Sequence, residues 1–156
     1  YEKVETIQKL LPYVDIFLTD FKYFRPETAK KYSNCPDYVE NAKAALNEMV
    51  KNKPLEFDGE MLKQGVIVRH LILPLHTQES KQVLDYLKQN YDKQILVSVM
   101  SQFTPFGECD RFAEINRKLT SREIKSVNNH FLELDLDGFI QNSKSADTCF
   151  IPNWNK

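Results

Sequence analysis

The sequence is poor in glycine and in cysteine. It has four glycines among 156 residues, too few for a glycine-rich phosphate loop, and no HExxH occurs. The three cysteines, Cys35, Cys109 and Cys149, stand far apart, and no CxxC or CxxxCxxC occurs. The sequence therefore predicts no locally built metal site, and we expect free thiols in a reducing cytoplasm.

The sequence also lacks an excess of one charge and any long apolar run. Its formal net charge is −1, with no block of like charges, which argues against nucleic acid or an anionic membrane as a partner. No apolar stretch reaches the ~18 residues of a membrane-spanning helix. No signal peptide is recognisable at the charged N-terminal end.

What is present is the composition of one folded domain, 1–156. Hydrophobic residues make up 42% and aromatic residues 12% of the chain, which is enough for a real core. The chain opens on Tyr1 and passes directly into helical spacing. We interpret it as a single fragment domain cut from a longer protein, although a processed N-terminus would look the same.

Apolar periodicity predicts alternating helices and strands. We expect helices over 3–12, 26–52, 77–91 and 120–134, strands over 14–21, 65–73, 95–103 and 138–141, and a loop-like tail from Asn142. Thr77 or Ser80 would cap the third helix, and Thr120 with Glu123 forms a capping-box pattern at the fourth.

This order predicts an α/β fold with parallel strands joined by right-handed crossovers. Three or four such units are too few to close an eight-stranded barrel, so we expect an open half-barrel or part of a larger one.

Polar residues at the ends of the predicted strands are the candidates for a site, because parallel sheets place their sites there. Asp20 and Lys22 would lie on one side of the first strand, where they could hold a zwitterionic ligand or each other. Arg69 and His70 would point to opposite faces of the second strand. Arg69 needs a partner, either a bound carboxylate or an acid such as Asp20. Gln102, near the end of the third strand, could hydrogen-bond a ribose or a peptide, or only backbone.

The three histidines are expected to be structural. His70 fits a core or helix-packing position, His76 lies past Pro74 in a loop and would be at the surface, and His130 sits in the middle of a helix. No arrangement of nucleophile, base and acid can be argued from the residues.

Five runs of the sequence, in this order, resemble the family of the pyruvate formate-lyase activating enzyme. VDIFLTDFKYFRPETAKKYS resembles a strand that ends in D-L-K, and GVIVRHLILPLHTQESKQVLDYLK resembles the following R-H-L-x-L-P strand with its acidic-Ser helix start. VSVMSQFTPFGE, EINRKLTSREIKSV and GFIQNSKSADTCFIPNW resemble a subgroup of radical S-adenosylmethionine proteins related to these activators. The resemblance covers nearly the whole chain.

The resemblance implies the C-terminal half of a (βα)₆ radical SAM barrel. In this family three cysteines hold a [4Fe–4S] cluster that binds S-adenosylmethionine. Reductive cleavage gives a 5′-deoxyadenosyl radical, which abstracts hydrogen from a partner such as a glycyl radical enzyme. The resemblance also implies an electron donor as a further partner.

The resemblance also assigns roles to single residues. Asp20 and Lys22 match the D-L-K positions beside S-adenosylmethionine, with the lysine near its carboxylate and the acid near the ligand or a bound cation. Arg69 matches the strand arginine of the active-site rim. Gln102 falls near a histidine position at the end of the sixth strand, with Ser101 and Phe103 as alternatives. We thus expect Asp20, Lys22, Arg69 and Gln102 to contact the cofactor.

The chain also departs from the family pattern. The CxxxCxxC loop and the glycine-rich amino-group site are not in it, and its three cysteines do not have the spacing of cluster ligands. Leu75 stands where a glycine is expected after the strand-end proline. We expect this fragment alone to be inactive and to dimerise through an open sheet edge. The alternative is a non-catalytic α/β binding module that uses the same rim.

Overall fold

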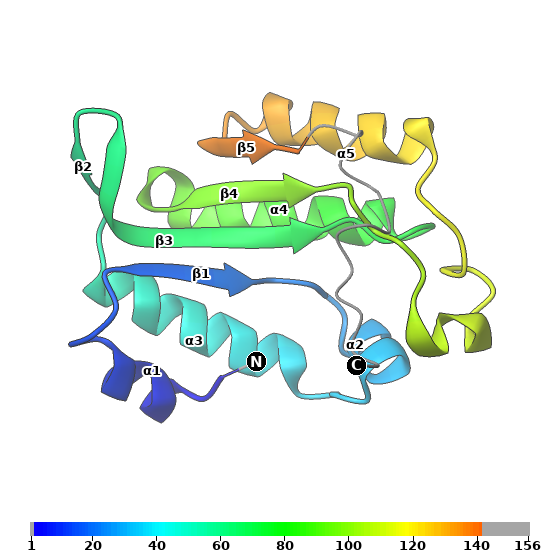
Figure 1. Ribbon diagram of the computed structural model, residues 1–156, viewed down its shortest axis with the longest axis horizontal. Coiled ribbons are helices and arrows are strands. Elements are labelled where there is room, and N and C mark those ends of the chain that lie inside the picture. The colour runs from blue at the N-terminus through cyan, green and yellow to red at the C-terminus, as the bar shows by residue number, and fades with distance from the viewer. Residues whose placement is uncertain (1, 142–156) are drawn as a thin grey trace, which may run out of the picture.

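The chain folds into an α/β structure with five helices and a five-stranded, mostly parallel sheet (Figure 1). The computed structural model describes residues 2–141. The helices are α1 (Val4–Leu10), α2 (Pro26–Ser33), α3 (Tyr38–Asn52), α4 (Thr77–Tyr91) and α5 (Ser121–Glu133). The strands are β1 (Ile16–Asp20), β2 (Glu56–Asp58), β3 (Met61–Leu71), β4 (Leu96–Met100) and β5 (Gly138–Ile140). Two 3₁₀ turns, η1 (Asp92–Gln94) and η2 (Gly107–Arg111), complete the elements.

Four strands run parallel in the order β1–β3–β4–β5, and β2 forms an antiparallel hairpin with the first part of β3. The register places Asp20, Arg69, Ser98 and Phe139 in one row across the sheet. The parallel sheet and its helical connections confirm the coarser prediction, an α/β fold with parallel strands. The four parallel strands form an open sheet, and the outer edge of β1 pairs with no strand among residues 2–141.

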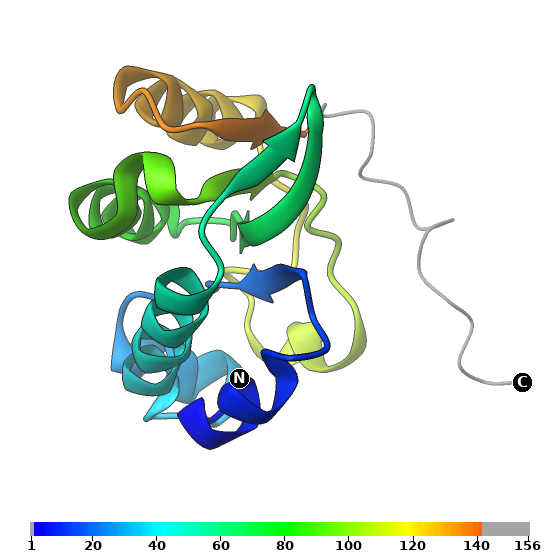
Figure 2. The same cartoon turned by 90° about the vertical axis from the view of Figure 1, so that its left-hand side faces the viewer.

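The core lies between the sheet and the helices, which gather on one face (Figure 2). Val66 and Val68 of β3, and Ile72 directly after it, point into this core and are fully buried. Successive strand residues point to opposite faces, so Ile67, Arg69 and Leu71 lie on the other face and are only partly buried. That open face carries Leu18, whose exposed fraction is 55%.

Two features of the structure differ from the prediction. The expected helix over 26–52 is split into α2 and α3, because Asn34 takes a left-handed conformation with φ 51° and ends α2. The hairpin of β2 and β3 was not predicted, since its turn is short and its polar strand has no apolar alternation. Gly59, with φ 60°, makes this turn possible.

The remaining boundaries follow the sequence with smaller differences. The strand expected over 95–103 ends at Met100, so Gln102 lies in the loop that follows. The capping box of Thr120 and Glu123 is confirmed, whereas α4 begins after His76 with no side-chain cap from Thr77 or Ser80. The tail that was expected from Asn142 onward lies outside the described residues, and so does Cys149. Within residues 2–141, no helix combines the length and apolarity needed to cross a bilayer.

Candidate functional site

Three charged side chains meet where β1 and β3 end. Arg69 Nε donates to Asp20 Oδ1 at 2.7 Å, and Lys22 Nζ lies 3.6 Å from Asp20 Oδ2. Asp20 and Arg69 are paired in the sheet register, so the backbone itself brings the two side chains together on the open face. The group formed by Asp20, Lys22 and Arg69, here called the rim group, carries one net positive charge.

Arg69 uses only part of its donor set. Its Nε is engaged by Asp20, and its two terminal nitrogens have no hydrogen-bond partner within residues 2–141. The side chain is 38% exposed and that of Lys22 is 49% exposed, so solvent reaches both cations. A planar guanidinium with a free edge, next to an ammonium, fits a carboxylate or phosphate. The residues present therefore fit the carboxylate of an amino-acid ligand.

Gln102 does not join this group by any direct contact in the described chain. It is exposed, and its Oε1 accepts a hydrogen bond from Gln141 Nε2 at 2.6 Å. Of the four residues predicted to contact the cofactor, the structure thus brings together Asp20, Lys22 and Arg69. Gln102 lies at the same end of the sheet but is engaged with the end of β5.

His70 lies on the opposite face from Arg69, as predicted. It is 1% exposed, and its Nδ1 lies 2.8 Å from the Phe21 carbonyl oxygen. Burial lowers the pKa of His70, so we assign a neutral ring whose Nδ1 donates to Phe21. Its Nε2 is buried and has no partner in the described structure. The prediction of a core histidine is confirmed.

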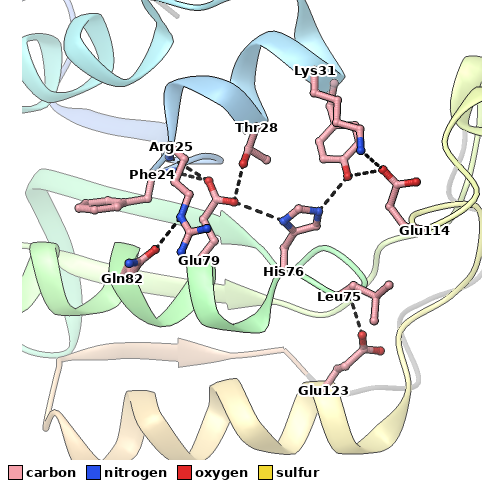
Figure 3. Close-up of polar contacts among 11 residues, drawn as sticks. Phe24, Arg25, Thr28, Lys31, Leu75, His76, Glu79, Gln82, Glu114 and Glu123 are labelled. Carbon is pink, nitrogen blue, oxygen red and sulfur yellow. Dashed lines mark hydrogen bonds and ion pairs between the residues drawn. The ribbon is translucent and has the colours of Figure 1, made fainter.

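A second polar cluster holds together the loops that follow β1 and β3 (Figure 3). Glu79 is 5% exposed, and its Oε1 accepts from the backbone N–H of Phe24 and of Arg25, each at 2.9 Å. Its Oε2 accepts from Thr28 Oγ1 at 2.8 Å and lies 3.3 Å from His76 Nδ1. Burial alone would raise the pKa of Glu79, but these hydrogen bonds, led by His76, outweigh it and lower the pKa to about 2.

The cluster continues from His76 to the loop after β4. Tyr32 Oη lies 2.8 Å from His76 Nε2 and donates to Glu114 Oε1 at 2.9 Å, while Lys31 forms an ion pair with Glu114. Burial and the Glu114 hydrogen bond raise the pKa of Tyr32, and the Lys31 contact lowers that of Glu114 to about 2. Phe112 packs edge-on against Tyr32 at 5.2 Å. These contacts tie three loops together at the end of the sheet that carries the rim group.

His76 was predicted to be a surface residue, and this prediction is wrong. Its side chain is only 24% exposed, because α2 and the segment after β4 pack around it. No local pattern reveals this, since Tyr32 and Glu114 are 82 residues apart in sequence. The only sequence pattern that could have pointed to Glu79 was the acidic residue followed by serine at the start of α4.

Leu75 has a left-handed backbone conformation, with φ 62°, which glycine adopts more readily than leucine. Its N–H donates to Glu123 Oε1 at 2.7 Å, and the Glu123 carboxylate is also held by Arg117 through two hydrogen bonds. The Arg117 contact comes first among the causes that lower the pKa of Glu123. Glu123, which takes part in the capping box of α5, thereby also holds the loop after β3 in place through Leu75.

The described residues offer no place for an iron–sulfur cluster. Within 2–141 no group of three or more His, Cys, Asp or Glu side chains is placed to hold a metal ion. Cys35 and Cys109 are free thiols in this part of the chain. These residues therefore do not fit a cluster, whereas the rim group fits an amino-acid carboxylate.

Comparison with known proteins gives one relative. Over 128 residues the chain is 32% identical to uncharacterized protein MJ0674 of Methanocaldococcus jannaschii. The match covers 81% of this chain and 34% of that protein, so the chain spans about a third of the length of this curated relative. No family model and no solved structure matches. The relative's name carries no activity, so a functional argument depends on the site and on the sequence motifs.

Proposed function

We propose that this chain is the C-terminal part of a radical S-adenosylmethionine enzyme of the pyruvate formate-lyase activating type. The observation that carries the proposal is the rim group. An arginine and a lysine share one aspartate at the ends of adjacent parallel strands, with the terminal guanidinium nitrogens open to solvent. The ordered motifs of the sequence support the same assignment, and the partial coverage of the relative agrees with a longer parent protein.

In this proposal Arg69 and Lys22 bind the carboxylate of S-adenosylmethionine. Asp20 accepts from Arg69 Nε and so fixes the plane of the guanidinium, which leaves its two terminal nitrogens directed at the ligand. Charge-assisted hydrogen bonds of this kind contribute about 1.5–3 kcal/mol each. The Glu79 cluster orders the loops beside the rim and does not itself contact the ligand.

The [4Fe–4S] cluster would supply the electron for reductive cleavage of S-adenosylmethionine. Its three cysteines would belong to the parent protein outside these 156 residues, and the fragment alone would be inactive. The free edge of β1 would then take up further strands of a (βα)₆ barrel. An electron donor and a protein substrate such as a glycyl radical enzyme would be the partners.

The test uses the full-length parent protein, purified without oxygen. We expect bound iron, formation of 5′-deoxyadenosine with a reductant, and an in-frame CxxxCxxC upstream of Tyr1. Arg69→Ala should weaken binding of S-adenosylmethionine about 10- to 150-fold, which corresponds to the loss of one such interaction. Lys63→Ala is the matched control, because Lys63 lies at the opposite end of β3 and, within residues 2–141, pairs only with Asp58. This variant should bind as the native protein does.

Three results would count against parts of this proposal. A parent protein without iron and without 5′-deoxyadenosine formation would refute the radical enzyme. Iron and activity with unchanged binding in Arg69→Ala would refute the assigned site. A protein without iron in which Arg69→Ala still weakens binding of S-adenosylhomocysteine would instead support the non-catalytic binding module.

A further inference from the structure

His76 lies between the carboxylates of Glu79 and Glu114 (Figure 3). One of its ring nitrogens, Nδ1, is 3.3 Å from Glu79 Oε2, and the other, Nε2, is 2.8 Å from Tyr32 Oη. Tyr32 Oη is in turn 2.9 Å from Glu114 Oε1. Four side chains from α2, α4 and the loops after β3 and β4 thus form one continuous series of hydrogen bonds.

The donor and acceptor chemistry of these groups determines how many protons the series holds. The Tyr32 hydroxyl has one proton and the Glu114 carboxylate can only accept, so the hydroxyl donates to Glu114. His76 Nε2 then has to donate to Tyr32 Oη. The Glu79 carboxylate also accepts only, so His76 Nδ1 has to donate to it. Both ring nitrogens are therefore donors, and a histidine with two ring protons is the positively charged imidazolium.

Both carboxyl groups are in the ionised form that this count requires. Burial alone would raise the pKa of Glu79, but its hydrogen bonds, led by the one from His76, lower the pKa to about 2. The contact with Lys31 comes first among the causes that lower the pKa of Glu114 to about 2. A His76 ring with one proton would therefore leave two acceptor atoms facing each other, or would take the Tyr32 proton away from Glu114.

Other titratable groups lie on the elements packed around His76: Lys22 and Tyr23 after β1, Lys31 of α2, His70 of β3, and Arg117 and Glu123 beside α5. The two lysines and the arginine are each paired with a carboxylate. Burial raises the pKa of Tyr23 and lowers that of His70, so both are neutral at pH 7. Among the described residues, the charge in direct contact with the His76 ring is thus the buried carboxylate of Glu79.

We propose that His76 is doubly protonated in this structure and that loss of one ring proton loosens the segment 112–116 from α2. Histidine changes its charge between pH 5 and 8, and the partly exposed ring can release the proton to solvent. Without its proton, Nε2 becomes an acceptor, and the Tyr32 hydroxyl turns from Glu114 to the ring. Glu114 then keeps its ion pair with Lys31 but loses the hydrogen bond that connects it to His76.

The pH thereby controls how firmly the loop after β4 is held at the end of the sheet that carries the rim group. The series of hydrogen bonds is complete at low pH, where the ring has both protons, and loses one contact as the pH rises. This inference does not depend on the proposed function, because it follows from the contacts of the loops alone.

Nitrogen-15 NMR of the histidine side chains tests the protonation state directly. We expect both ring nitrogens of His76 to be protonated at pH 5, and Nε2 to lose its proton as the pH rises to 8 while Nδ1 keeps the proton that it donates to Glu79. The signals of His76 are those absent from His76→Gln. A His76 ring with a single proton at pH 5 would overturn the proposal.

Hydrogen exchange tests the consequence for the segment. The backbone N–H groups of Ile115 and Asn116 each donate to the Phe112 carbonyl oxygen at 3.0 Å. Their protection factors, which compare the exchange rate with that of an unstructured peptide at the same pH, should fall about tenfold between pH 5 and pH 8, as expected for the loss of one hydrogen bond to a charged group. Tyr32→Phe keeps the ring against Phe112 but removes the hydroxyl, so protection should be lower at pH 5 and the same at both pH values.

His130→Gln is the matched control. His130 also contacts a carboxylate, with Nε2 2.7 Å from Asp85 Oδ1, but it joins α5 to α4 and takes no part in the series around Tyr32. This variant should keep the tenfold change. Protection that does not change with pH in the native protein, or a change that persists in Tyr32→Phe, would overturn the proposal. If Tyr32→Phe does not fold, the NMR measurement on the native protein still decides.

Discussion

Glu79→Gln removes one buried negative charge while it keeps the size of the side chain. The native carboxylate accepts two hydrogen bonds from the loop after β1, one from Thr28 of α2 and one from His76 just before α4. The amide can still accept from Phe24 and Arg25 through its oxygen, but its NH₂ group meets Thr28 and His76 where an acceptor stood. The variant should therefore fold, with a lower free energy of unfolding.

The pKa of Glu79 sets the size of the effect. The pKa falls from an ordinary 4.5 to about 2 in the folded protein, and each unit corresponds to about 1.36 kcal/mol. The charge thus contributes about 3 kcal/mol at pH 7. Because the folded pKa is the lower one, this stabilisation is fully present above pH 4.5 and is lost as the pH falls through 2. About 2 kcal/mol of it should disappear between pH 7 and pH 3.

Urea unfolding of the native chain and of Glu79→Gln at pH 7 and pH 3 measures this directly. The stability difference between the two proteins should be about 3 kcal/mol at pH 7 and shrink by about 2 kcal/mol at pH 3. Glu60→Gln is the control, because Glu60 is exposed and forms no hydrogen bond or ion pair within residues 2–141. A difference between the native chain and Glu79→Gln that stays the same at both pH values would refute the reasoning.

Two further substitutions test the backbone. Leu75→Gly should leave the free energy of unfolding unchanged or raise it by up to about 1 kcal/mol. The left-handed conformation costs a non-glycine residue about 1–2 kcal/mol, and the larger entropy that glycine loses on folding offsets part of the gain from removing this cost. Leu75→Val should instead lower the free energy of unfolding, and a reversed order in urea unfolding would show that φ 62° is not strained. Gly138→Ala would place a Cβ 1.9 Å from the Val97 carbonyl oxygen, so β5 must separate from β4. Faster amide exchange at Val97 is the expected readout, and native protection there would contradict it.

Much of the fold could be predicted from local signals. The apolar runs of β1, β3 and β4 and the capping box of α5 are encoded within a few residues each, and all of them form. The break between α2 and α3 was missed because a left-handed Asn34 is one residue in an otherwise helical stretch. The β2–β3 hairpin was missed because its register is shifted and its strand is polar and exposed.

The candidate site divides in the same way. Strand parity was sufficient to place Asp20 with Lys22 and to separate Arg69 from His70, because side chains alternate along a strand with a period of two. Parity cannot say which strands are neighbours or how they are aligned. The pairing of Asp20 with Arg69, and hence the ion pair between them, depends on the register of β1 against β3.

The sequence by itself determined the fold class, the main strands and the charged residues at their ends, since these depend on periodicity and local capping. Only the tertiary structure decided that Glu79, His76, Tyr32 and Glu114 form one cluster. It also decided that the helices within residues 2–141 cover only one face of the sheet. Both depend on loops and helices that are distant in sequence and come together only when the core packs, and no local pattern encodes that distance.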